Sequence, residues 1–306
     1  MSNKMRLLLM FILIPFLFSC TKKEEKYSRK GNKIYFGYYP QTLVTNSKTI
    51  DKLNKTIKNY PTETNDFEWT NYKYYIEDEE SNFMWYLDVD LDNDKKYDYR
   101  GVYFIKYRPY YTDKPSEENN SLQLHSDYYI NTVYWFKYER IEWDILEENN
   151  GKAKLITTNV LDSRDFYPST SNEKFYHNGG EGNGNDYELS DLRKWLNSGF
   201  YNSSFNDNEK ALIDAVDNDK VTQLTFDEAR TYYTSNEERL SFGSDYAKAQ
   251  GLEYVANNHS IWVLGKSSEY CSYQNYIMIV GHSGNLIHTE VYSTFMGIRP
   301  VIYINL

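Results

Sequence analysis

Five aspartates in one short stretch are spaced like the oxygen ligands of a metal-binding loop. They are Asp88, Asp90, Asp92, Asp94 and Asp98. Carboxylate oxygens at alternate positions are what calcium loops require. Counting from Asp88, however, the sixth position is Asn93 instead of glycine, and the twelfth is Tyr99 instead of a bidentate glutamate. Two interpretations stay open for this stretch: a calcium site, or the solvated turn of a hairpin.

The other reactive residues do not form a recognisable catalytic set. Glu142 and Asp144 could face one side of a strand, as two glycosidase acids do, but their backbones would stand only about 7 Å apart on a solvated face. The five histidines lack the short spacing of a zinc site. Cys271 is either a small buried side chain or an exposed thiol. We therefore expect a protein that is not an enzyme, although acids from distant segments could still assemble a site.

The start of the chain has the pattern of a secretory signal. A basic segment precedes the apolar stretch Leu7–Phe18, which is shorter than the roughly 20 residues that a membrane-spanning helix needs. The residues Leu17-Phe18-Ser19-Cys20 resemble the lipobox of bacterial lipoproteins, in which the cysteine thiol receives diacylglycerol and the chain is cut just before it. We expect residues 1–19 to be a signal peptide and residues 20–30 a flexible tether. The lipid on Cys20 would hold the protein to the inner or outer membrane, facing the periplasm or the exterior.

The amino-acid composition limits the kinds of partner that the chain can bind. The chain has 44 acidic and 34 basic residues and a net charge of −10, so it would repel nucleic acid, which is not expected as a partner. With Cys20 lipidated, only Cys271 remains, and no intrachain disulfide can form. Tyrosine occurs 32 times. Its flat apolar face and hydroxyl suit sugar stacking and protein contacts, but also half-buried strand positions.

The sequence predicts strands in the first part of the chain, short helices in the middle and strands again at the end. Aromatic runs near residues 34–40, 83–89 and 99–107 are typical of strands, and the last two flank the acidic stretch as a hairpin. Asn149-Asn150-Gly151 predicts the turn of a second hairpin. Four short helices are expected to begin at the capping residues Ser190, Asn206, Thr225 and Ser244. The first of them is expected to end at Gly199. This segregation predicts an α+β fold for residues 31–306.

Six motifs along the chain also indicate a family. They are Phe36–Thr42, Ile141–Leu146, Leu192–Asn197 with Phe200–Asn202, Leu224–Ala229, Asp245–Gly251 and Gly297–Ile302. In sequence and order they resemble the bacterial family of domains of unknown function numbered 6273. In that family the first two motifs lie close together, which implies that residues 43–137 are a β-rich insertion or subdomain and residues 138–306 the main body.

The family is similar to C-type lectins and to the formylglycine-generating enzyme. The resemblance implies a lectin-like domain whose short terminal strands pair, with short helices around the sheet. The chain departs from the family after Trp262, where Gly265 and Lys266 replace the usual arginine and serine, and a proline is missing. Formylglycine-generating chemistry would need a pair of cysteines, and only Cys271 is present.

Together these features predict a lipid-anchored protein of the bacterial cell envelope whose domain binds a glycan or a protein. Two alternatives remain: an enzyme that acts on envelope glycans, and a structural coat lipoprotein. The one cofactor that the sequence suggests is calcium at Asp88–Asp98. The sequence does not identify the residues that would bind the ligand.

Overall fold

The computed structural model of the chain describes residues 26–72, 74–76, 79–81, 84–105, 122–123, 128–167, 184–255, 257, 259–266, 270–271, 273–293 and 295–306. The predicted signal peptide, Cys20 and the first part of the predicted tether lie outside these residues. No described helix is long and apolar enough to cross a membrane.

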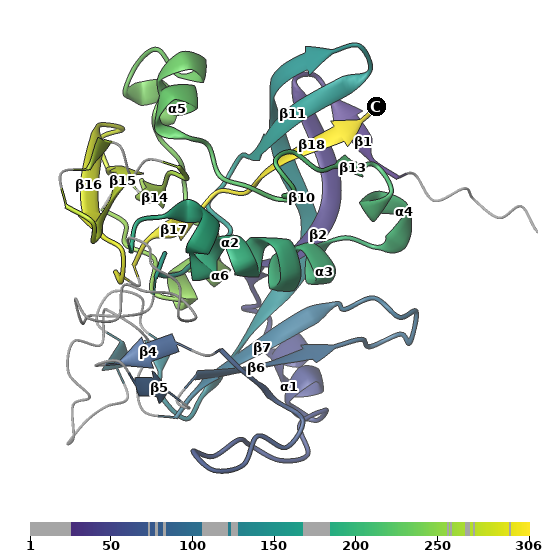
Figure 1. Ribbon diagram of the computed structural model, residues 1–306. Coiled ribbons are helices and arrows are strands. Elements are labelled where there is room, and N and C mark those ends of the chain that lie inside the picture. Colours follow the sequence, from purple (N-terminus) through teal and green to yellow (C-terminus); the bar gives the residue numbers. More distant parts are fainter. Residues whose placement is uncertain are drawn as a thin grey trace, which may run out of the picture.

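A curled antiparallel sheet of nine strands forms the centre of the fold (Figure 1). Its strands are β1 (Ser28–Lys30), β2 (Lys33–Leu43), β3 (Thr70–Asn71), β6 (Met84–Val89), β7 (Tyr99–Phe104), β10 (Val133–Asn149), β11 (Lys152–Thr157), β13 (Ile213–Asp214) and β18 (Val301–Asn305). The long strand β10 organises the sheet. One edge of β10 pairs with β2, while the other edge pairs with β7 near its start and with β11 near its end. The strand β18 extends the sheet beyond β11.

Smaller strand groups surround this sheet. They are β4 (Tyr74–Ile76) with β5 (Glu79–Ser81), β8 (Leu122–Gln123) with β9 (Tyr128–Tyr129), β12 (Asp162–Ser163) with β17 (Gly297–Ile298), and β14 (Trp262–Val263) with β15 (Tyr276–Val280) and β16 (Leu286–Glu290). The mixture of a mainly antiparallel β framework with a few short helices confirms the α+β prediction.

The helices are short and mostly capped as predicted. They are α1 (Ser47–Asn54), α2 (Asp191–Trp195), α3 (Tyr201–Ser204), α4 (Asp207–Lys210), α5 (Phe226–Tyr232) and α6 (Asp245–Ala249), with single turns η3 (Tyr187–Leu189), η4 (Leu196–Phe200) and η5 (Glu237–Arg239). The side chains of Ser190 and Ser244 accept hydrogen bonds from the first turns of α2 and α6. Asn206 and Thr225 each form a complete capping box, with Glu209 and Glu228 respectively.

Three details differ from the sequence-based expectations. The prediction that the first and last strands pair is wrong, because β10 and β11 lie between β2 and β18 in the sheet. Residues 28–30, assigned to the tether, form β1 and pair with β2 around Gly31, whose φ is +61°. The helix that starts at α2 does not end at Gly199 but continues through the π-helical turn η4 into α3. Gly199 instead makes room for the indole ring of Trp195, because an added Cβ would lie only 2.8 Å from Cδ1 of that ring.

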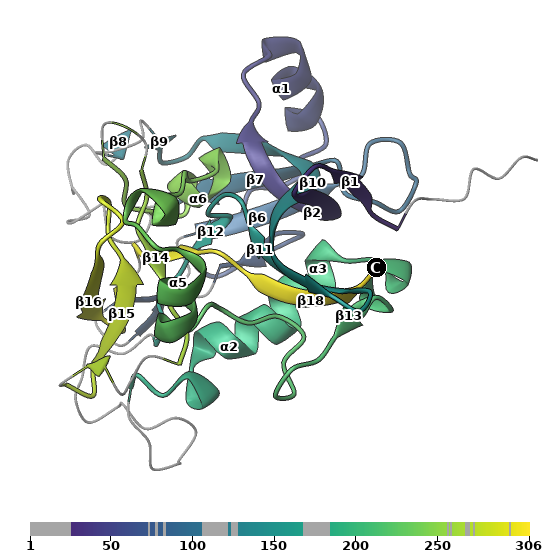
Figure 2. The ribbon, with the colours of Figure 1, turned by 90° about the horizontal axis from the view of Figure 1, so that it is seen from above.

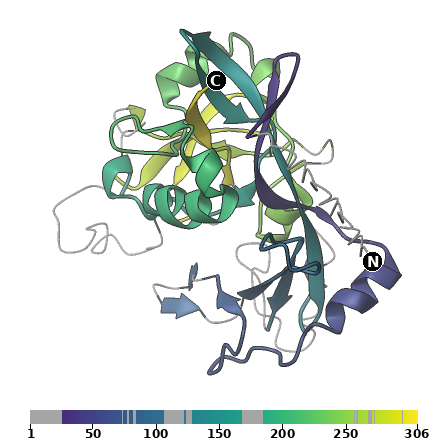
Figure 3. The same ribbon diagram turned by 90° about the vertical axis from the view of Figure 1, so that its right-hand side faces the viewer.

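The described parts of the segment 43–137 lie at one end of the molecule. In Figures 1 and 3, α1, β6 and β7 lie opposite the end formed by the hairpin β10–β11, and in Figure 2 α1 projects away from the other elements. The largest hydrophobic core nevertheless joins both ends, since Met84 and Phe104 belong to the same buried cluster as Trp143 and Ile302. A small aromatic cluster of Trp69, Trp85 and Tyr103 lies beside it.

Candidate functional site

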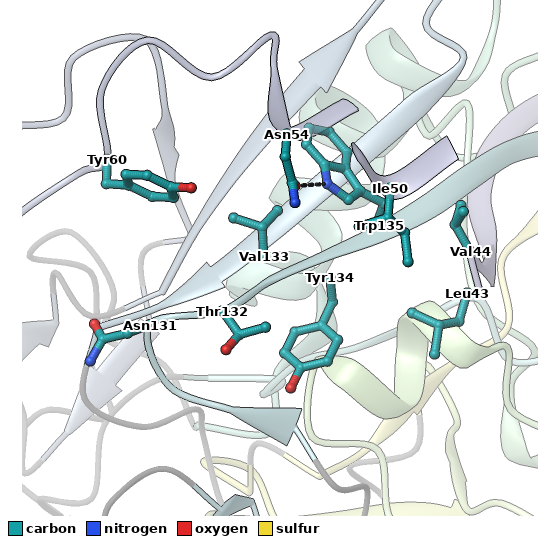
Figure 4. A pocket seen from close by; sticks show the side chains of 10 residues that line it. All are labelled: Leu43, Val44, Ile50, Asn54, Tyr60, Asn131, Thr132, Val133, Tyr134 and Trp135. Atoms are coloured by element: carbon teal, nitrogen blue, oxygen red, sulfur yellow. Dashed lines mark hydrogen bonds between the residues drawn. The ribbon is translucent and has the colours of Figure 1, made fainter. Parts of the chain in front are cut away.

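A cavity of about 430 Å³ opens where β2 separates from β10. The two strands pair from Asp144 with Lys33 to Phe136 with Leu43, and one further bond joins Val44 N–H to the carbonyl of Trp135. Beyond that point the chain turns into α1, and the edge of β10 is no longer covered by β2. The residues that line the cavity are Leu43, Val44, Ile50, Asn54, Tyr60, Asn131, Thr132, Val133, Tyr134 and Trp135 (Figure 4).

Amide and hydroxyl groups give the cavity its polar character. The indole N–H of Trp135 donates to Oδ1 of Asn54 over 2.8 Å, which fixes the amide of Asn54 and leaves its NH₂ as a donor (Figure 4). The hydroxyl of Tyr103 likewise donates to Oδ1 of Asn131 over 3.1 Å. Thr132 contributes a hydroxyl beside them. The lining therefore combines apolar walls with a few oriented donors, as is usual for small-molecule sites.

Tyr60 forms an aromatic wall of the same cavity. Its ring packs on Trp69, with ring centroids 6.4 Å apart, and on Tyr103, with centroids 5.2 Å apart. The indole N–H of Trp69 donates to the carbonyl of Asn59 over 2.9 Å, which holds the loop that carries Tyr60. Tyr60 is still 49% exposed. A supported, accessible ring next to hydrogen-bond donors can stack against the apolar face of a sugar.

The sequence did not single out any residue of this cavity. Its lining comes from segments as far apart as Leu43 and Trp135, and the polar groups are ordinary asparagine and threonine side chains. The high tyrosine content was the only signal that pointed toward such a surface.

The acidic stretch forms the turn between β6 and β7, as predicted. Oxygen atoms of Asp90, Asp92 and Asp98 lie within 4.8 Å of one another and could hold one cation. They also accept hydrogen bonds from the turn itself: Asp90 from the N–H groups of Asn93 and Lys95, and Asp98 from that of Leu91.

The remaining predicted ligands have other partners. The carboxylate of Asp94 accepts from the N–H of Lys96 over 2.8 Å. Asp88 lies in β6 and forms a bidentate ion pair with the buried guanidinium of Arg100, with both N–O distances 2.8 Å. The structure thus brings together three of the five aspartates and joins Asp88 to the core.

The turn also fixes the charge of Asp90. Desolvation acts to raise the pKa of this carboxyl, but the hydrogen bonds from the backbone of Lys95, Asn93 and Asp94 together outweigh it and hold the pKa below its ordinary value. Asp90 is therefore a carboxylate near neutral pH, which is the form that binds a cation.

Glu142 and Asp144 share one lysine. The ammonium of Lys33 pairs with Glu142 and lies 3.5 Å from Oδ1 of Asp144. Desolvation acts to raise the pKa of Glu142, but the hydrogen bonds from Lys33 and Tyr35 outweigh it, and the pKa is lowered. Glu142 thus has the properties of a permanent carboxylate and not of a proton donor.

Cys271 is half-buried, and burial raises the pKa of its thiol. A thiol with a raised pKa stays protonated near neutral pH and is a poor nucleophile. His282 connects two loops, because its ring nitrogens lie 3.0 Å from the carbonyl of His259 and 3.0 Å from Oε1 of Glu253. The hydrogen bond with Glu253 raises the pKa of His282 despite partial burial.

A known protein family matches the second half of the chain. Residues 150–306 match the model of a family described as a domain of unknown function, DUF6273. Neither the curated proteins nor the solved structures contain a match to the chain. Four of the six motifs lie inside the matched region, while Phe36–Thr42 and Ile141–Leu146 precede it. Since the match covers just over half of the sequence, the chain belongs to the DUF6273 family.

Proposed function

We propose that this protein is a lipid-anchored component of the bacterial cell envelope that binds a carbohydrate and does not catalyse a reaction. The lipid anchor would be on Cys20, at the end of the apolar segment. We also propose that the fold is a variant of the C-type lectin type; the short helices around an irregular antiparallel sheet support this, whereas β2 and β18 do not pair directly as the resemblance implied. In this proposal the binding site is the cavity beside α1.

The observation that carries the proposal is the ring of Tyr60. An aromatic side chain that is 49% exposed, packed on two further rings and bordering a cavity of about 430 Å³ is a suitable platform for one face of a pyranose. The amides of Asn54 and Asn131 can donate to sugar hydroxyls from the adjacent walls. Two segments support this geometry: α1, capped by Asn46, and the loop held by Trp69.

The direct test is binding of the chain from Thr21 to Leu306 to an array of envelope and host glycans, followed by calorimetry with the best ligand. Tyr60→Ala is expected to weaken binding by about 5- to 150-fold, since loss of one aromatic contact costs about 1–3 kcal/mol. Tyr273→Ala is the matched control, because Tyr273 is 65% exposed and lies outside the cavity. Equal affinity of the two variants, or no glycan binding, would contradict the proposal.

Calcium is tested in the same experiment. If the turn between β6 and β7 holds calcium and the ion supports binding, chelation will weaken binding to the wild type. The variant Asp92→Asn with Asp98→Asn will then bind weakly whether calcium is present or not. If chelation has no effect, the turn is a structural element without a role in ligand binding.

One observation favours the enzyme alternative. Burial raises the pKa of Asp165 to about 6, against the opposing effect of Arg164, and the nearby carboxylate of Asp191 adds to the rise. An acid with this pKa beside a second carboxylate is a known arrangement for glycoside hydrolysis. Release of reducing sugars from envelope glycan by the wild type, and its loss in Asp165→Asn, would replace the binding proposal with this one.

A further inference from the structure

Arg164 lies between the two ends of the molecule. It follows β12, and its backbone N–H donates to the carbonyl of Met296 over 3.0 Å, so its position in the main body is fixed. Its guanidinium carbon lies 4.4 Å from the ring centroid of Trp195 in α2 and 5.6 Å from that of Tyr72 in the segment 43–137. Aromatic rings from both parts of the chain thus hold the planar group.

Within the described residues the guanidinium of Arg164 forms no hydrogen bond, although its charge acts to lower the pKa values of the nearby Asp162 and Asp165. The Nε of Arg164 is buried and forms no hydrogen bond, and within the part of the chain that the structure describes, the side chain makes no ion pair. The hydroxyl of the adjacent Tyr72, which is 6% exposed, is also buried without a hydrogen bond. Buried polar groups are nearly always hydrogen-bonded, so a buried N–H and a buried hydroxyl without partners are exceptions that need an explanation.

Another arginine shows how a guanidinium is satisfied elsewhere in the molecule. Arg239 is buried, and its guanidinium donates to the carbonyls of Gly284 and Tyr233 and to Oδ1 of Asn236. Arg164 makes no comparable contact with the aspartates that lie near it. Asp162 uses its oxygens to accept from the hydroxyl of Tyr39, over 2.5 Å, and from the N–H of Ser163, over 2.7 Å.

We propose that Arg164 and the hydroxyl of Tyr72 form a binding site for an oxyanion, namely a carboxylate or phosphate group of a ligand. A guanidinium stacked on aromatic rings keeps its plane fixed and presents its N–H groups at the edge, which matches two oxygens of such a group. The hydroxyl of Tyr72 supplies a further donor. This site is separate from the cavity beside α1, and the inference does not rest on the proposed carbohydrate binding.

The test uses the chain from Thr21 to Leu306 and follows thermal unfolding with increasing inorganic phosphate or acetate, against sodium chloride of equal ionic strength. A ligand that binds only the folded state raises Tm, so the favoured anion should produce a saturable rise that chloride does not. The two anions distinguish a phosphate site from a carboxylate site. Arg164→Lys should need about 10- to 100-fold more anion for the same rise, because a charged group remains but the paired hydrogen bonds are lost.

Arg164→Met is the second variant, since it removes the charge but keeps an apolar chain between the rings. Added anion should have no effect on its Tm beyond that of chloride. Arg230→Met is the control, because Arg230 is exposed and also stacks on an aromatic ring, that of Phe226, at 5.6 Å. A wild-type response in Arg164→Met would overturn the proposal. So would the absence of any response beyond that of chloride in the wild type, which would indicate that only water satisfies these groups.

Discussion

Two bidentate arginine–carboxylate pairs show how burial decides how much an ion pair contributes to stability. Asp88 and Arg100 have side chains that are only 13% and 6% exposed, while Glu148 and Arg29 are 40% and 43% exposed. Asp88→Asn should lower the free energy of unfolding by about 3–5 kcal/mol, because it leaves the charge of Arg100 buried. Glu148→Gln should lower it by less than about 1 kcal/mol. Urea denaturation measures both, and similar losses in the two variants would contradict this argument.

Asp165 makes stability depend on pH. Burial raises its pKa from 3.8 to about 6, Arg164 acts against the rise and Asp191 adds to it. Between these two values the folded protein holds more protons than the unfolded chain. The stabilising contribution of the protonated group is therefore fully present below about pH 4 and is lost as the pH rises through about 6.

Asp165→Asn should remove this pH dependence and increase the free energy of unfolding at neutral pH by up to about 3 kcal/mol. Urea denaturation over a series of pH values between about 4 and 7 gives the measurement. Asp191→Asn should produce a smaller gain, because the repulsion between the two carboxylates contributes less to the raised pKa than burial does, and because Asp191 also pairs with Lys194. The assignment fails if Asp165→Asn has the same pH profile as the wild type.

At the scale of elements, the turn between β15 and β16 is fixed by a close contact with the chain before η5. Gly284 has φ +76°, and a Cβ there would lie 1.8 Å from the carbonyl oxygen of Asn236. Gly151, in the turn between β10 and β11, has φ +74° but has no neighbour within 4 Å of an added Cβ.

Gly284→Ala should therefore destabilise the fold by about 3–5 kcal/mol, through both the backbone clash and the positive φ. Gly151→Ala should cost about 1–2 kcal/mol, through the positive φ alone. Thermal and urea unfolding of the two variants separate these contributions. If both lose the same stability, the contact with Asn236 is not a rigid one.

Local signals in the sequence predicted most of the elements. Capping depends on residues three apart, so the helices after Asn206 and Thr225 could be placed from the sequence alone. Hairpin turns are similarly local, as Asn149-Asn150-Gly151 shows. The role of Gly199 could not be predicted in this way, because its missing Cβ makes room for the ring of Trp195 and does not end a helix.

Contacts between distant segments could not be predicted from local signals. The order of the strands depends on how the whole sheet packs, so the sequence did not predict that β10 and β11 lie between β2 and β18. For the candidate sites the same limit holds. The aspartates of one turn are visible as a cluster in the sequence, whereas Tyr72 and Arg164 come together only through folding.

At the scale of the whole molecule, the proposed lipid on Cys20 can be tested through the strength of membrane attachment. The net charge of −10 disfavours contact with anionic lipid surfaces. Each methylene of an acyl chain that enters the bilayer contributes about 0.8 kcal/mol, so a diacylglycerol group on one cysteine would be sufficient. Under the proposal, attachment should depend on Cys20 and should resist washing with salt.

The two cysteines of the chain provide a test with its own control. Cys20→Ser should abolish incorporation of a labelled fatty acid and move the protein from the membrane fraction to the soluble fraction. Cys271→Ser should keep both the label and the membrane fraction, because the Cys271 thiol is half-buried and its burial raises the pKa. Label that persists in Cys20→Ser would show that the apolar segment is not a lipoprotein signal. Membrane retention without label would instead indicate that the segment 1–19 remains on the protein as its anchor.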